Sequence, residues 1–448
     1  MPYDADSHSA LTALIEHAQK AGADAAEASV AQRESLSVDV RMGALEGVER
    51  EESRSIALRA FVGQRQASAS SSDLSPSGLR ALAERVTQMA KTAPEDKYCG
   101  LLDAPLLDKG PWPDLEQTDT ARPEAEHLRD MALAAEAAAL AVAGVANSSG
   151  AGASWDYARF AHRTSTGFEA SETGTSYSLV TQPIAERDGA MERDYEYRTK
   201  RFFADLPSPE ALGKAAGERT VARLGPRKIK SCKAPVIFEN RLASGILGPL
   251  LSGITGAAVA RGTSFVKDKL GQRVLPESFQ IAEDPFLKRG LASRAFDGEG
   301  MACRERPLIE NGVITTWLLN SASARQLGLE PTGHATHGHG GPPGVSTSNL
   351  AVKPGEHDLQ GLMRSAGAGL FVTDKFSPSL NMNNGDWSIG VSGYWFENGE
   401  IAYPVSEITV AGNLLDIYAR LIAGADLDRR GAIEIPSLLV DDLAIGGL

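Results

Sequence analysis

The densest group of potential metal ligands in the sequence is a set of histidines within six residues of one another: His334, His337 and His339. Neutral imidazoles bind divalent metals such as zinc, so these three could form a metal site with Glu330 or His357 as a further ligand. They lie in a loop rich in Gly and Pro, residues 331–344. An alternative is a flexible, solvated loop that holds metal weakly, because nothing pre-orders the ligands. A third interpretation is a loop that lines a substrate channel.

A second polar cluster lies in residues 381–387, between two apolar segments: Asn383, Asn384 and Asp386. Asn and Gly are common in turns, so one interpretation is a plain loop. The functional alternative is a rim that hydrogen-bonds the backbone of a bound peptide. The sequence contains no G-x-S-x-G, Walker or G-x-G-x-x-G motif, so no catalytic residue follows from these patterns.

The elements that would position these clusters differ between the two halves of the chain. In the N-terminal half, helical spacing predicts helices at residues 9–21, 74–90, 122–143 and 207–224, and alternation predicts strands at residues 28–39, 55–61, 65–71 and within 145–199. Helices and antiparallel strands in this order predict a two-layer α+β unit. Gly225-Pro226 ends the last helix, so we expect an N-terminal domain of residues 1–226 and a C-terminal domain of residues 227–448.

The C-terminal domain is predicted to be β-rich and antiparallel, which makes the fold class α+β. A Glu-Asn-Gly turn between apolar strands occurs twice, in residues 308–314 and 395–401. Asn-Gly favours a type I′ hairpin, because both central residues of that turn need positive φ. Elsewhere after Pro235 we expect mostly short strands and turns, with a last strand at residues 437–440.

Several segments of the C-terminal half together resemble the TldD/PmbA family of peptidases, whose members are also described as modulators of DNA gyrase. The strongest match is residues 393–414, and the others are residues 235–238, 262–265, 309–312 and 331–333. Each segment by itself is weak evidence for the family, but the segments together are specific for it. The resemblance is to the TldE/PmbA type of subunit.

In zinc-bearing members of that family, H-E-x-x-x-H follows a Pro-Val-hydrophobic segment. Its histidines hold Zn²⁺, and its glutamate activates the metal-bound water. The matching positions here are Gly248, Pro249 and Gly253, none of which can ligate zinc or accept a proton. The motif occurs nowhere else in the sequence, and the last cysteine is Cys303, although zinc-bearing members draw a ligand from a cysteine near the C-terminus. The resemblance therefore implies no catalytic and no metal-binding residue in this chain.

The resemblance implies a function through assembly. A TldE-type subunit forms a heterodimer with a zinc-bearing TldD-like subunit, and such complexes cleave unfolded or linear peptides in peptide maturation and degradation. The partner then supplies zinc, general base and nucleophilic water, and this chain needs no cofactor and shapes the cleft. An exposed strand edge that pairs with the backbone of the peptide is one physical way to restrict entry to extended chains.

Other assignments stay open at this point. The chain could be a non-enzymatic peptide-binding or scaffold protein that retains the family fold, or a self-sufficient metallopeptidase that uses the His334 cluster. A homodimer in the absence of the partner is also open.

The composition limits the partners and the compartment. The formal net charge is -13 and the pI is near 5.2, so an acidic surface would repel phosphate, and we expect no direct nucleic-acid binding. Three dispersed cysteines fit a reducing compartment. No apolar run reaches the roughly 20 residues that a membrane helix needs. These features predict a cytoplasmic protein with no membrane partner.

Overall fold

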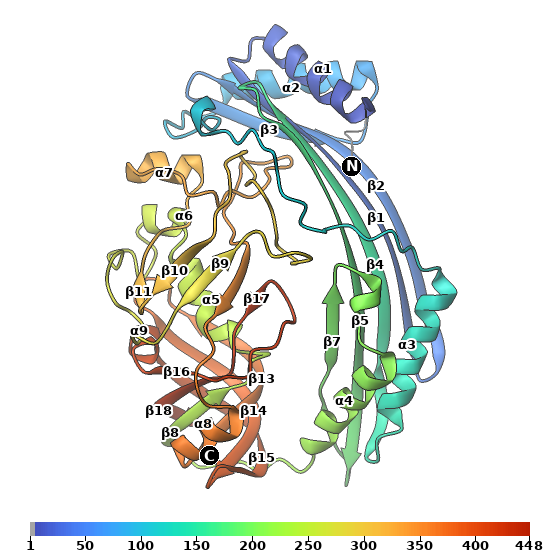
Figure 1. Cartoon of the computed structure of the whole chain (residues 1–448), viewed down its shortest axis with the longest axis vertical. Helices are drawn as coiled ribbons and strands as arrows, with labels where there is room; N and C mark the ends of the chain where they lie inside the picture. The colour runs from blue at the N-terminus through green and yellow to red at the C-terminus, as the bar shows by residue number, and fades with distance from the viewer. Residues whose placement is uncertain (1–4) are drawn as a thin grey trace.

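The computed structural model describes residues 5–448 and contains three β-sheets with helices packed on them (Figure 1). The α+β class predicted from the sequence is confirmed. One long, curved sheet comes from the N-terminal half, and the two smaller sheets of the C-terminal half lie on its concave side. Within residues 5–448, no helix combines the length and apolar character that crossing a membrane requires.

The N-terminal sheet is antiparallel, with the strand order β3-β2-β1-β4-β5-β6 and with β7 paired to β5. Its strands are β1 (Ala25–Arg41), β2 (Ala44–Val62), β3 (Arg65–Ser71), β4 (Val145–Thr164), β5 (Glu169–Arg187), β6 (Ala190–Arg193) and β7 (Glu196–Lys200). The four longest strands have 17, 19, 20 and 19 residues. At about 3.3 Å per residue they run for roughly 55–65 Å, so the sheet extends along one whole side of the molecule.

Four helices cover one face of this sheet, in two pairs: α1 (Ala5–Lys20) with α2 (Pro76–Thr92), and α3 (Ala125–Leu140) with α4 (Pro209–Ala222). All four were predicted from the sequence, with ends that differ by a few residues. Val30 of β1 packs in the core under the first pair, and Leu36 packs under the second. Because successive strand residues point to opposite faces, Ser29 and Arg33 face the C-terminal half instead.

The C-terminal half contains a six-stranded and a five-stranded sheet. The first has the order β15-β14-β13-β8-β18-β16: β8 (Cys232–Phe238), β13 (Ala368–Leu380), β14 (Asp386–Glu397), β15 (Glu400–Asn413), β16 (Leu421–Ala423) and β18 (Leu438–Gly446). The second has the order β11-β10-β9-β12-β17: β9 (Ile281–Asp284), β10 (Arg306–Glu310), β11 (Val313–Ile314), β12 (Asn349–Val352) and β17 (Ile433–Glu434). Pairing is antiparallel except between β8 and β13 and between β12 and β17. An additional pairing of β15 with β18 joins distant strands of the six-stranded sheet.

Short helices complete this half: α5 (Ser244–Gly253), α6 (Gly256–Ala260), α7 (Ser321–Leu327), α8 (Leu359–Ala366) and α9 (Leu414–Tyr418). The two Asn-Gly hairpins are confirmed, since Asn398 and Gly399 have φ of +54° and +82°, and Asn311 and Gly312 have +50° and +76°.

Two expectations for the C-terminal half were wrong. Residues 242–259 form α5 and α6 rather than strands and turns, because their Leu and Ile side chains pack into the largest core despite four glycines. The last strand does not end at Val440 but continues to Gly446, through a bulge at which Asp442 adopts a φ of +51°.

Candidate functional site

Helix α5 carries Gly248, Pro249 and Gly253, the three positions that the resemblance matches to the zinc motif of the family. Gly248 and Pro249 are half-buried in its middle, and Gly253 is buried at its end. A Cβ added at Gly248 would have no atom of the described chain within 4 Å. A Cβ at Gly253 would lie 2.9 Å from Cγ2 of Val266 and 3.1 Å from Oγ of Ser264. A side chain at Gly253 would therefore displace Val266, whereas a Cβ at Gly248 meets open space apart from its neighbours in the chain.

A lysine covers the first turn of α5. The Nζ of Lys375, from β13, donates to the carbonyl of Leu242 at 3.4 Å, and a Cβ at Gly245 would lie 2.5 Å from that Nζ. Burial lowers the pKa of Lys375. The lysine side chain therefore fills the space beside Gly245 at the start of α5.

The side chains near these elements do not fit a zinc site. Across the part of the chain that the structure describes, no three His, Cys, Asp or Glu side chains converge closely enough to hold a metal ion. Cys303 is buried, and burial raises the pKa of its thiol to about 12. Among the described residues, the surroundings of α5 therefore offer no converged set of ligands for zinc.

His334 is buried and its ring is fully engaged. Its Nε2 donates to Oε2 of Glu283 on β9 at 2.8 Å. The hydroxyl of Thr332 lies 2.7 Å from Nδ1 and also accepts a hydrogen bond from the N–H of Leu319. Because the Glu283 carboxylate accepts from Nε2, it fixes which ring nitrogen carries the hydrogen. These contacts give His334 a structural role in joining its loop to β9.

His337 and His339 attach the same loop to the N-terminal sheet. Nε2 of His337 donates to Oε2 of Glu172 on β5 at 2.9 Å, and the ring packs on Phe160. Both ring nitrogens of His339 are hydrogen-bonded at 2.9 Å to serine hydroxyls, those of Ser29 and Ser55. Burial lowers the pKa of His339, which favours a neutral ring.

The three histidines therefore have different partners and do not form one site. The loop is docked between the two halves of the molecule, which contradicts the expectation of a flexible, solvated loop. Glu330 and His357 are exposed, and within residues 5–448 neither is hydrogen-bonded to the histidines.

The polar cluster of residues 381–387 forms the turn between β13 and β14. Asn384 Nδ2 donates to Oδ2 of Asp386 at 2.7 Å, and Asn413 Nδ2 donates to the other carboxylate oxygen at 3.1 Å. The backbone N–H of Asn383 donates to Asn381. Asn383, Asn384 and Asp386 are exposed, so they stabilise the turn and remain accessible, and contact with a peptide stays a prediction.

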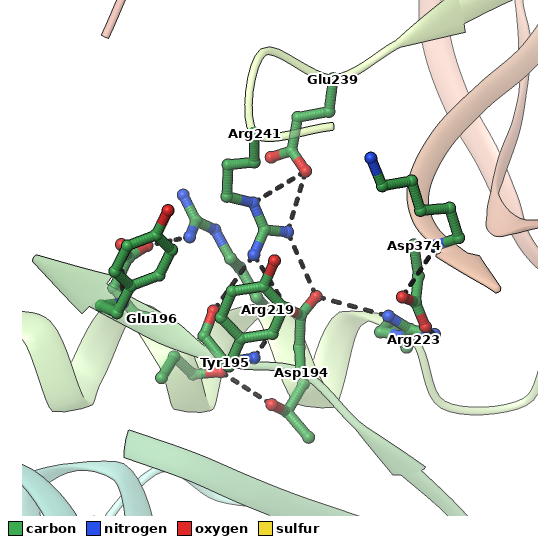
Figure 2. Close-up of polar contacts among 12 residues, drawn as sticks. Asp194, Tyr195, Glu196, Arg219, Arg223, Glu239, Arg241 and Asp374 are labelled. Carbon is green, nitrogen blue, oxygen red and sulfur yellow. Dashed lines mark hydrogen bonds and ion pairs between the residues drawn. The ribbon is translucent and has the colours of Figure 1, made fainter. Parts of the chain in front are cut away.

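A buried ion-pair network joins the N-terminal sheet to the C-terminal half (Figure 2). Arg241, which follows β8, donates to Asp194 and to Glu239, each at 2.9 Å. Arg223, which follows α4, lies 3.5 Å from Asp194 and 2.9 Å from Asp374 of β13. The side chains of Arg241 and Asp194 are only 2% and 3% exposed. Because a buried charge is costly unless it is paired, this network fixes how the halves meet.

Beside this junction, two adjoining cavities of about 530 and 350 Å³ lie between the N-terminal sheet and loops of the C-terminal half. Both are lined by Arg201, and the continuous segment of residues 287–294 forms one wall of the pair. We call these two cavities together the basic groove, because three dibasic pairs line it: Lys200-Arg201, Lys288-Arg289 and Arg429-Arg430.

The basic groove was not predicted from the sequence, whose charge indicated an acidic surface. The three pairs are far apart along the chain, and only the fold brings them together. The available signal was the recurrence of dibasic pairs in a chain of net charge -13, but their convergence could not be read from the sequence.

Three family models match most of the chain. The model for domain 1 of PmbA/TldA metallopeptidases matches residues 26–90, the central-domain model matches residues 119–224, and the C-terminal-domain model matches residues 231–447.

Two bacterial proteins are similar to this chain over most of their length. A metalloprotease PmbA homolog of Haemophilus influenzae is 38% identical over 441 residues, which cover 98% of this chain and 95% of that protein. The metalloprotease PmbA of Escherichia coli is 37% identical over 426 residues, covering 95% of this chain and 92% of that protein.

Solved structures share the fold. The crystal structure of a proposed modulator of DNA gyrase from Bacteroides thetaiotaomicron has a TM-score of 0.91 and 25% identity, covering 99% of this chain and 100% of that one. TldE from Thermococcus kodakarensis has a TM-score of 0.87 over 98% of this chain and 100% of that one, and at 18% identity it shows likeness of fold alone.

Proposed function

The chain belongs to the PmbA/TldD metallopeptidase family, and from this premise we propose that it is the TldE/PmbA-type subunit of a peptidase complex. In this complex a zinc-bearing TldD-like partner supplies the metal, the general base and the nucleophilic water. This chain shapes the cleft that admits unfolded or linear peptides. The cytoplasmic location, and a homodimer in the absence of the partner, stay predictions.

The observation that carries the proposal is the composition of α5. The relatives are named metalloproteases, yet the three motif positions here are Gly248, Pro249 and Gly253, which offer no ligand atom and no proton acceptor. The packing of Gly253 against Val266 adds a steric reason, since even a methyl group there would displace a buried neighbour. A subunit that has lost its ligands can still contribute a wall of a substrate cleft.

The alternative of a self-sufficient metallopeptidase at the histidine loop has little support. His334 is held between Glu283 and Thr332, His337 faces Glu172, and His339 lies between two serines. Moving these rings onto one metal would break all of these hydrogen bonds and undock the loop.

The test is co-expression of the chain with a family member that contains H-E-x-x-x-H, followed by purification through a tag on this chain. We expect a stoichiometric heterodimer by size-exclusion chromatography with light scattering, zinc in the complex, and cleavage of a linear but not a folded substrate. The isolated chain should contain far less than one zinc per molecule by elemental mass spectrometry. As a matched control, the Glu of the partner's motif is changed to Gln, which should leave assembly intact and abolish cleavage.

Two results would refute the proposal. One is about one equivalent of zinc in the isolated chain together with partner-free peptide cleavage. The other is failure to form a complex with an H-E-x-x-x-H protein under any ratio of the two chains.

A further inference from the structure

The three dibasic pairs of the basic groove come from separate elements. Lys200 ends β7, Arg289 lies in the segment that follows β9, and Arg429 lies in the loop between β16 and β17, which reaches toward β7 (Figure 1). Contacts tie these elements together: Nζ of Lys200 donates to the carbonyl of Arg429 at 3.1 Å, and Arg289 Nη1 lies 3.1 Å from Asp205. The cations therefore gather on both sides of one groove.

The cations of the groove fall into two kinds. Some are neutralised by carboxylates: Lys288 and Arg289 share Glu116, and Arg430 pairs with Glu196 and Asp428. Arg429 is 70% exposed and lies 3.6 Å from Glu434. Arg33 likewise pairs with Asp156. Over residues 5–448, no carboxylate forms an ion pair with Lys200, Arg201 or Arg294.

These three donate to neutral oxygen atoms instead. Arg201 donates to the carbonyls of Thr175 at 3.1 Å and Leu291 at 2.5 Å. Arg294 donates to Oγ and O of Ser346 at 3.0 and 2.6 Å, and its Nε is buried with no hydrogen-bond partner among the described residues. Glu172, Asp297 and Glu434 act on these three cations through their charge but form no ion pair with them. Cations that donate directly only to neutral oxygens keep part of their attraction for an anion, and the carbonyls fix their positions.

We propose that the basic groove binds the carboxylates of an extended peptide, and so gives this subunit a preference for acidic linear substrates. The inference rests on the proposed function, which makes a linear peptide the ligand. The carboxylates are those of Asp and Glu side chains or of the peptide's C-terminus. The two cavities of about 530 and 350 Å³ adjoin along residues 287–294, so they suit successive residues of one extended chain.

A peptide fits the groove better than a nucleic acid does. Glu172, Asp205 and Glu434 also line the groove, so its cations are separated from one another; such spacing suits the separate carboxylates of a peptide better than a phosphate backbone with a charge at every nucleotide. The whole chain has a net charge of -13, which opposes polyanion binding over any long range. Thr347, which also lines the groove, offers a neutral hydroxyl that suits a peptide group.

The experiment measures binding of a short fluorescein-labelled linear peptide, with Glu at every second position, to the full-length chain by fluorescence anisotropy. The comparison peptide has Gln in place of each Glu, and a third has an amidated C-terminus. The test variant is Lys200→Ala/Arg429→Ala, because both side chains reach solvent and neither is needed for the core. The control, Lys214→Ala/Lys353→Ala, removes the same charge from exposed sites outside the groove.

We expect the acidic peptide to bind at least about tenfold more tightly than its Gln counterpart, since charge-assisted hydrogen bonds are worth more than one factor of ten. The test variant should lose about that factor for the acidic peptide only, and the control should lose little. If amidation of the C-terminus weakens binding, the groove binds the terminal carboxylate of the peptide. If binding is unchanged, the groove binds the carboxylates of its Glu side chains. Either result supports the groove.

Equal affinity for the acidic and Gln peptides would overturn the inference, as would equal losses in the test and control variants. A single-stranded oligonucleotide that displaces the peptide at a lower concentration than unlabelled acidic peptide, at about 0.15 M salt, would overturn it too. The assay needs neither partner nor cleavage, so its failure leaves the co-purification test of the proposed function untouched.

Discussion

Glu299 shows how burial changes a single side chain in this fold. It is almost fully buried, and one carboxylate oxygen accepts hydrogen bonds from both the N–H and the hydroxyl of Ser321, each at 2.8 Å. Burial, reinforced by the nearby Asp297, raises the pKa of Glu299 from the ordinary value of 4.5 to about 7. The distant charge of Arg59 opposes this shift without cancelling it.

The raised pKa predicts a pH dependence of stability. Below pH 4.5 the carboxyl is protonated in both states, and between pH 4.5 and 7 only the folded state keeps the proton. The free energy of unfolding should therefore fall as pH rises through this window and level off above it, by up to about 3 kcal/mol. Glu299→Gln should flatten this part of the profile and be more stable than the natural chain at pH 8, as measured by urea unfolding at a series of pH values.

The matched control is Glu84→Gln, which changes an exposed glutamate and should leave the pH profile unchanged. Parallel profiles for the natural chain and Glu299→Gln would show that the carboxyl titrates normally in the folded protein.

At the scale of elements, α5 contains two glycines in opposite environments. The Cβ position of Gly248 is open, whereas that of Gly253 is 2.9 Å from Val266. Gly248→Ala should change the free energy of unfolding by less than about 1 kcal/mol, because the better helix propensity of Ala is opposed by contact of its Cβ with the ring of Pro249. Gly253→Ala should destabilise it by about 1–3 kcal/mol through overpacking.

The two substitutions control each other, since both add one methyl group to the same helix. Thermal unfolding of the two variants and the natural chain checks the pair. A loss of stability in Gly253→Ala no larger than that in Gly248→Ala would contradict the assignment of open and closed positions, and with it the steric argument against a ligand at the end of α5.

Elements were predicted where local chemistry decides the structure. The Asn-Gly hairpins depend on the φ preferences of two residues. The four N-terminal helices depend on the spacing of their apolar residues. Helices α2 and α4 are also capped by a serine that precedes a proline. The sequence did not predict α5, whose glycines have low helix propensity and whose stability comes from tertiary packing. The two-domain division near residue 226 stays a prediction.

The candidate site was less predictable than the fold, because its contacts link distant parts of the chain. The partners of His337 and His339 are on β5, β1 and β2, so the spacing of the histidines said nothing about where the rings point. The three dibasic pairs of the basic groove also come from distant parts of the chain, so their spacing in the sequence does not show that they meet.

At the scale of the whole molecule, Arg241 links the two halves. Arg241→Ala would leave Asp194 buried with one partner fewer, and should lower the free energy of unfolding by about 3–5 kcal/mol. The control Arg65→Ala removes an exposed pair with Glu95 and should cost at most about 1 kcal/mol. Urea unfolding measures both, and limited proteolysis reports whether the halves separate.

Adding Asp194→Asn to Arg241→Ala tests the physical reason. Asp194 then keeps only the ion pair with Arg223 at 3.5 Å, so removing its charge should recover part of the lost stability. No recovery would mean that packing around Arg241, and not charge, holds the halves together.

The central position of β8 has a consequence for synthesis on the ribosome. Val236 of β8 pairs with Leu370 on one side and with Val440 on the other, so its neighbours are translated long after it. The N-terminal sheet draws all its strands from residues 25–200 and can form while translation continues. The C-terminal half must wait for β18, which makes it the slow, aggregation-prone stage of folding. During synthesis, the chain should therefore pass through a stage in which the N-terminal sheet is folded and the C-terminal half is unfolded. Chaperones would act on the unfolded C-terminal half.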